Sequence, residues 1–123
     1  MSNILHKDLS YSIMGAVFEV HNVLGPGFLE KVYERALQEE LRICGLLVEA
    51  QKEIKVLYKA TDVGTYVADL VVNNEILLEL KAVDRLNDFH QAQVLHYLKA
   101  TGLQLGLLVN FGRKQVEYKR LVC

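Results

Sequence analysis

The chain has 123 residues and a formal net charge of −1, with 14 Lys and Arg against 15 Asp and Glu. A chain of this length buries enough surface for one core, so we expect residues 1–123 to form a single domain. The near-zero charge excludes an obligate nucleic-acid coat protein and a polybasic membrane binder. It is compatible with an enzyme that acts on nucleic acid, because acidic metal ligands cancel local basic patches in the count.

The sequence contains no targeting or membrane signal. Residues 1–12 are polar where a signal peptide needs an apolar run, and no apolar stretch approaches the ~18 residues of a membrane span. Cys44 and Cys123 lie far apart and outside any CxxC pattern, which indicates neither a zinc site nor a disulfide framework. We therefore expect a cytoplasmic protein with reduced cysteines and no membrane partner.

Two amphipathic helices begin the chain. Apolar residues spaced by three and four predict a helix over residues 6–23, which the Gly-Pro-Gly turn at residues 25–27 ends. A second helix is predicted over residues 28–44, and Gly45 is a natural C-terminal stop. The inward stripe of this helix includes Glu40, an acid for which the sequence offers no partner.

From residue 47 onward the pattern becomes extended, except for one helix predicted over residues 88–101. Strands are predicted over residues 47–58, 66–72, 76–83, 103–111 and 115–122. A turn is expected around residues 61–64, and Asn73-Asn74 indicates a hairpin. The order ααβββαββ predicts an α/β fold of the α+β kind, with a mixed sheet flanked by helices.

Charged residues interrupt two of the most apolar strands. Glu79 and Lys81 share one face of the strand over residues 76–83, and Asp69 interrupts the neighbouring strand in the same way. A buried Asp–Lys or Glu–Lys pair would explain them, but two carboxylates and one ammonium leave one negative charge uncompensated. A hard divalent cation, Mg²⁺ or Mn²⁺, balances that charge through carboxylate oxygens.

The loop between these two strands decides whether the carboxylates meet. A two-residue loop (residues 73 and 74) would pair Asp69 with Leu78 and turn Asp69 and Glu79 to opposite faces of the sheet. A three-residue loop over residues 73–75, or a bulge, places them on the same face. A metal site at these carboxylates therefore predicts an irregular hairpin.

Other side chains are candidates by position. Glu30 flanks the inward stripe of the second helix and is a candidate third metal ligand, although a solvated acid favoured by the helix dipole explains it as well. Gln93 and Tyr97 lie one turn apart, where they can hold a metal-bound water or a phosphate oxygen, or simply pack. Substrate contacts are predicted for His21, which precedes the turn at residues 25–27, and from charge and sequence proximity for Arg85, Lys99, Arg113 and Lys114.

The segment Gly27-Phe28-Leu29-Glu30-Lys31-Val32-Tyr33 resembles the GxxExxY motif that names a family of small bacterial and archaeal proteins. The resemblance extends over nearly the whole chain, through residues 20–27, 66–69, 78–82, 93–102 and 106–111. That family is similar to a branch of the PD-(D/E)XK nuclease superfamily, whose core is αβββαβ. The resemblance implies this core with an extra N-terminal helix and a C-terminal strand.

The resemblance also implies roles for individual residues. Asp69 matches the motif Asp, and Glu79 and Lys81 match the ExK. Glu30 matches the acidic residue on the first core helix. The QxxxY signature of recombination-type exonuclease domains is matched by Gln93 and Tyr97, and Ala68 stands where the superfamily name has Pro.

The function expected from these residues is Mg²⁺- or Mn²⁺-dependent hydrolysis of phosphodiester bonds in nucleic acid, DNA more than RNA. Asp69, Glu79 and Glu30 would hold the metal, and Lys81 would orient the attacking water or stabilise the phosphate. One alternative is a catalytically silent module that binds nucleic acid or a protein partner. A structural scaffold would be favoured if Lys81 were ion-paired in a closed pocket. The segment over residues 116–122 offers an edge for a homodimer.

Overall fold

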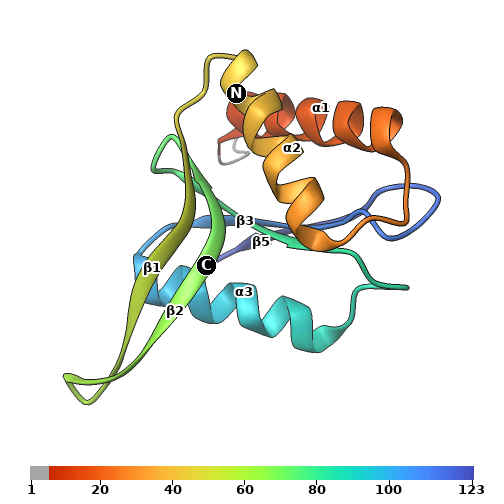
Figure 1. Ribbon diagram of the computed structural model, residues 1–123. Helices are drawn as coiled ribbons and strands as arrows, with labels where there is room; N and C mark the ends of the chain where they lie inside the picture. The colour runs from red at the N-terminus through yellow and green to blue at the C-terminus, as the bar shows by residue number, and fades with distance from the viewer. Residues whose placement is uncertain (1–5) are drawn as a thin grey trace.

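Residues 6–123, which the computed structural model describes, fold into three helices and five strands (Figure 1). In chain order they are α1 (Lys7–Leu24), α2 (Glu30–Ile43), β1 (Val48–Tyr58), β2 (Thr61–Val72), β3 (Ile76–Lys81), α3 (Asp88–Thr101), β4 (Leu105–Asn110) and β5 (Glu117–Val122). The order confirms the predicted αβββαβ core, preceded by an extra helix and followed by an extra strand.

The strands form one mixed sheet with the order β1-β2-β3-β4-β5. β3 and β4 are parallel, and the other neighbours are antiparallel. α1 and α2 cover one face of the sheet and α3 covers the other (Figure 1). Every residue of β4 is buried, as expected for a central strand covered on both faces.

Each face of the sheet has its own apolar core. On the first face, α1 and α2 contribute Ile13, Val17, Tyr33, Leu37 and Leu41, all at most 1% exposed. On the second face, Val94 and Leu98 of α3 pack with Leu77 and Leu108. The two cores anchor α2 and α3 on opposite sides of the central strands.

The hairpin between β2 and β3 has a three-residue loop. Leu70 pairs with Leu78, which leaves residues 73–75 as the loop and confirms the predicted irregularity. Asn73 and Asn74 adopt left-handed φ angles of 52° and 56°, a conformation that Asn tolerates better than most residues. Asp69 and Glu79 consequently lie on the same face of the sheet.

The turn between β1 and β2 precedes the predicted position at residues 61–64, so that prediction was wrong. Tyr58 pairs with Thr61, and Lys59 and Ala60 form the turn with φ angles of 48° and 67°. Neither residue type favours the left-handed region, so the sequence carries no turn signal here. The result is a long hairpin. We call its residues 52–68 the arm, because they pair with each other beyond the β2–β3 ladder and project past the sheet (Figure 1).

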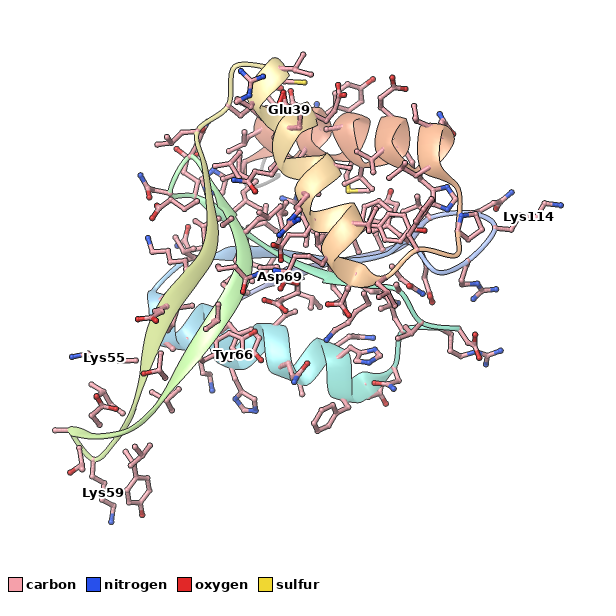
Figure 2. The ribbon with its side chains drawn as sticks, in the orientation of Figure 1. Glu39, Lys55, Lys59, Tyr66, Asp69 and Lys114 are labelled. Atoms are coloured by element: carbon pink, nitrogen blue, oxygen red, sulfur yellow. The ribbon has the colours of Figure 1, made fainter. Side chains whose placement is uncertain are left out.

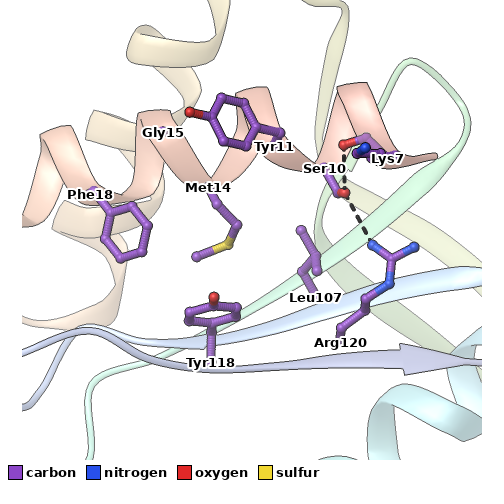
Figure 3. Close-up of a pocket in the computed structure, with 9 residues that line it drawn as sticks. All are labelled: Lys7, Ser10, Tyr11, Met14, Gly15, Phe18, Leu107, Tyr118 and Arg120. Atoms are coloured by element: carbon purple, nitrogen blue, oxygen red, sulfur yellow. Dashed lines mark hydrogen bonds between the residues drawn. The ribbon is translucent and has the colours of Figure 1, made fainter. Parts of the chain in front are cut away.

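A pocket of about 460 Å³ lies between α1 and β5 (Figure 3). The rings of Phe18 and Tyr118 meet edge to face at one end of it. At the other end the Arg120 guanidinium donates to the Ser10 hydroxyl. None of the residues that line this pocket belongs to the site predicted from the sequence.

Gly112 packs against the segment that follows β3. An added Cβ would lie 2.5 Å from both the amide nitrogen and the carbonyl oxygen of Val83. We expect Gly112→Ala to lower the free energy of unfolding by about 2 kcal/mol, because backbone atoms must move to admit the methyl group. Gly64→Ala is the matched control, since its Cβ meets no atom within 4 Å. Urea denaturation measures both, and equal effects would contradict the packing argument.

Candidate active site

Asp69 and Glu79 meet where β2 and β3 separate. Beyond the Leu70–Leu78 pair, the two strands are joined by hydrogen bonds between these carboxylates and backbone amides of the opposite strand. Glu79 Oε1 accepts from the amide of Asp69 at 3.2 Å, and Asp69 Oδ2 accepts from the amide of Leu80 at 2.8 Å. Each carboxylate is therefore fixed by the backbone of the opposite strand. Figure 2 shows Asp69 in the space between α2 and α3.

A pair of tyrosines connects this site to α3. The Tyr66 hydroxyl donates to Glu79 Oε1 at 3.0 Å, and its ring stacks on that of Tyr97. Gln93 lies one turn before Tyr97, and its side chain is half-buried without a hydrogen-bond partner among residues 6–123. The structure thus brings Tyr97 to the carboxylates through Tyr66, a residue that the sequence-based site did not include.

The start of α2 is fixed by the turn that precedes it. The hydroxyl of Tyr33 donates to the carbonyl oxygen of Gly25 and accepts from the amide of Phe28. Its ring stacks on Phe111, with the ring centroids 4.6 Å apart. The turn requires a φ of 69° at Gly25, a left-handed conformation that glycine adopts without steric cost. The Tyr of the GxxExxY-like segment therefore sets where α2 begins, at Glu30.

A second acid on α2, which the sequence analysis did not select, is buried beside the site. Glu34 is 6% exposed and accepts hydrogen bonds from Lys31, at 3.0 Å, and from Gln51. Gln51 lies between the Ala50–Leu70 and Lys52–Ala68 pairs of the β1–β2 ladder, as Asp69 does, and its φ of 54° is left-handed. Backbone strain of this kind is a feature of functional sites. Glu34 and Gln51 thus form the wall of the site on the side of α2.

The carboxyl groups are held in an environment that disfavours their charged forms. Burial raises the pKa of Asp69 to about 6, and the charges of Glu30 and Glu34 raise it as well. Burial also raises the pKa of Glu79 to about 8, with a further contribution from the charge of Asp69. The charge of Lys81 acts in the opposite direction on both. Glu30 and Glu34, whose charges raise the pKa of Asp69, therefore outnumber Lys81, the basic residue whose charge lowers it.

Lys81 is not neutralised by any of these acids. Among residues 6–123, no ion pair within 4.0 Å involves its ammonium group. The charge of Lys81 lowers the pKa values of Asp69 and Glu79. Burial is the main cause of the lowered pKa of His90, and the charge of Lys81 lowers it further. Lys81 is thus free to interact with a group that enters the site.

The donor set fits a hard cation at two carboxylates. Within the described residues, Oδ1 of Asp69 and Oε2 of Glu79 accept no hydrogen bond, which leaves one open oxygen on each group. The same part of the chain contains no group of three or more His, Cys, Asp or Glu side chains that could hold a metal. Glu30 is exposed at the start of α2, so its role as a third ligand stays a prediction.

The five residues predicted to bind substrate do not converge. His21 is buried, and its Nε2 lies 2.9 Å from the carbonyl oxygen of Arg113. These contacts are those of a side chain that packs within the fold. Arg113 and Lys114 belong to the exposed β4–β5 loop, and Arg85 is exposed in the β3–α3 loop. Lys99 is exposed near the end of α3, apart from the other four. Their contacts with a substrate stay predictions.

This mixed sheet, with an Asp and a Glu-x-Lys on neighbouring strands at the point where they separate, is a nuclease-type architecture. The chain belongs to the PD-(D/E)XK nuclease superfamily, whose family model matches residues 7–121. Membership implies a nucleic-acid substrate and divalent metal ions in general terms. No helix within residues 6–123 combines the length and apolarity needed to span a membrane.

Solved structures show the same fold. The structure titled "Crystal structure of SSO0001" aligns with a TM-score of 0.57 at 17% sequence identity. The alignment covers 94% of this chain and 58% of that chain, so this chain spans less than two thirds of the other protein's length. At this identity the likeness concerns the fold alone. A comparison with curated proteins found no match.

Proposed function

We propose that this protein is a Mg²⁺- or Mn²⁺-dependent nuclease that hydrolyses phosphodiester bonds, in DNA more readily than in RNA. The observation that carries the proposal is the buried pair Asp69 and Glu79, which presents two open carboxylate oxygens beside an unpaired Lys81. Superfamily membership supports nuclease-type chemistry. A structural scaffold is less consistent with these side chains, because it has no need of excess buried charge.

In such a reaction different residues of the site would bind the metal, orient its ligands and contact the attacking water or the phosphate. Asp69 and Glu79 would hold the cation through their open oxygens, with Glu30 as the predicted third ligand. Tyr66 and the strand amides keep the two carboxylates oriented. A bound Mg²⁺ would supply a water of lowered pKa and neutralise charge at the scissile phosphate. Lys81 would hydrogen-bond the attacking water or a phosphate oxygen.

Gln93 and Tyr97 complete the proposed site from α3. The amide of Gln93 is available to a water or a phosphate oxygen, since no described residue occupies it. Burial raises the pKa of the Tyr97 hydroxyl, which therefore stays a neutral donor at physiological pH. Both side chains can orient a substrate, while the charge needed for the reaction comes from β2 and β3.

Metal titration tests the proposal directly. We expect Mg²⁺ or Mn²⁺ to raise the thermal unfolding temperature, by an amount that follows the metal concentration, and to be required for cleavage. The assay uses single-stranded, duplex and branched DNA together with RNA, and EDTA should abolish the activity. Absence of both metal binding and cleavage would contradict the proposal. Nucleic-acid binding without cleavage would favour the catalytically silent module instead.

A further inference from the structure

A groove of about 450 Å³ separates the arm from α3. It is lined by Lys55, Val56, Leu57, His96, Lys99 and Ala100. Half of these residues carry basic groups and none is acidic. Figure 2 shows Lys55 on the arm, and His96 and Lys99 belong to α3. The arm and α3 therefore contribute basic side chains to one concave surface.

The two lysines of this groove, Lys55 and Lys99, form no ion pair within 4.0 Å among residues 6–123. Because the whole chain has a net charge of −1, a groove lined by basic and not by acidic residues is a local exception. Like charges that converge on one groove repel each other unless an anion lies between them. The groove therefore fits an anionic ligand.

The groove adjoins the candidate active site. Lys55 pairs with Thr65, the residue before Tyr66, and Lys99 follows Tyr97 by two residues. The Tyr66–Tyr97 stack thus lies between the groove and Glu79. Thr65 and Asp69 are four residues apart on β2, a distance of about 13 Å. A polymer with repeated phosphates can reach across this distance, whereas a single phosphate cannot.

The size of the groove favours one strand over two. A volume of about 450 Å³ accommodates a segment the size of a nucleotide and not a duplex. A second pocket of about 370 Å³ adjoins it and shares Lys55, Leu57 and Ala100 with it. This pocket contains the apolar side chains of Ile54, Val71 and Leu103, with Lys52 and Glu53 among its other lining residues. An unpaired base fits such a pocket. Basic grooves combined with apolar or aromatic platforms are the usual means of binding single strands.

We propose that the groove between the arm and α3 binds the phosphate backbone of single-stranded nucleic acid. Lys55 and Lys99 contact phosphates, and the adjoining pocket receives an unpaired base. The inference rests on the proposed function and specifies its substrate, which is a single strand or the single-stranded part of a branched molecule.

The test measures binding without cleavage. Asp69→Asn protein is titrated into a labelled single-stranded oligonucleotide of about 20 nucleotides, at NaCl concentrations from about 50 to 200 mM. In this background Lys55→Gln and Lys99→Gln should each weaken binding and reduce the slope of log K against log salt by about 0.7, the value for one lost phosphate contact on a single strand. Lys119→Gln, on the opposite edge of the sheet, removes the same charge as a matched control and should leave the slope unchanged.

The possible outcomes distinguish failure of the groove proposal from failure of the proposed nuclease activity. Equal slopes in all three lysine variants, with binding intact, would overturn the assignment of the groove as a binding site. The proposed nuclease activity would not be affected by that result. Tighter binding of a duplex, with the slope falling by about 0.9 per variant, would overturn the single-strand assignment. The expected slopes together with a wild-type protein that cleaves nothing in Mg²⁺ would support the groove and overturn the nuclease. Absence of binding to either substrate would overturn the groove.

Discussion

The Asp69→Asn variant is expected to lose metal-dependent cleavage by about 10²–10³-fold or more while its fold stays intact. The Asn side chain keeps an oxygen that can accept the hydrogen bond from the amide of Leu80, so the local geometry is retained. What disappears is the negative charge beside Glu79 that attracts a cation. Initial rates in Mg²⁺ measure the loss, and circular dichroism checks the fold.

Two further variants sharpen this expectation. Asp62→Asn removes a carboxylate from the arm, where it accepts a hydrogen bond from the amide of Gly64, and should cleave at the wild-type rate. Lys81→Ala should abolish cleavage but keep the rise in unfolding temperature that Mg²⁺ causes, because Lys81 is not a metal ligand. Asp69→Asn should lose both. Unchanged rates in Asp69→Asn and Lys81→Ala together would disprove the assigned site.

The second large effect concerns stability. In the metal-free protein, burial raises the pKa of Glu79 to about 8 from an ordinary value of 4.5. Its charge therefore opposes folding, and this cost begins above pH 4.5 and grows until the pH reaches about 8. Glu79→Gln removes the charge and keeps an acceptor for Tyr66. We expect the variant to be more stable than the wild type by about 2–4 kcal/mol at pH 8 and by less than about 1 kcal/mol near pH 5.

Urea denaturation in EDTA at the two pH values measures this difference. The wild-type protein itself should become less stable from pH 5 to pH 8, since Asp69 and Glu79 both have raised pKa values. Glu19→Gln, on the exposed side of α1, is the control and should show no such trend. A Glu79→Gln variant that is less stable than the wild type at pH 8 would show that burial does not dominate the energy of Glu79.

The sequence predicted those parts of the fold where local chemistry agrees with the tertiary structure. The limits of α3 agree with the prediction because the Asn87 side chain caps its start and Gly102, with a φ of 77°, ends it. The register of Asp69 against Glu79 followed from requiring both acids on one face, and the three-residue loop confirms it. The parallel pairing of β3 with β4 follows from the helix between them.

Other features depend on contacts that periodicity does not record. Lys59 and Ala60 form a left-handed turn without a Gly or Asn, so the arm was not predicted. Glu40, inside the predicted inward stripe, is only half-buried, whereas Glu34 is buried because Gln51 reaches it from β1. Tyr66 joins the site through a hydrogen bond and a ring contact with other elements. Such partners come from the sheet and α3, and not from neighbours in sequence.

The three-residue loop between β2 and β3 limits how the length of this protein can vary during evolution. With the three-residue turn kept, deleting one residue before β3 would place Leu80 opposite Asp69, and inserting one residue would place Leu78 there. In both cases Glu79 would move to the other face of the sheet. Two extra residues at Lys59 and Ala60 would only lengthen the arm, because its strands pair with each other there. We therefore expect homologous chains to differ in length at the arm and to keep three residues in the β2–β3 loop.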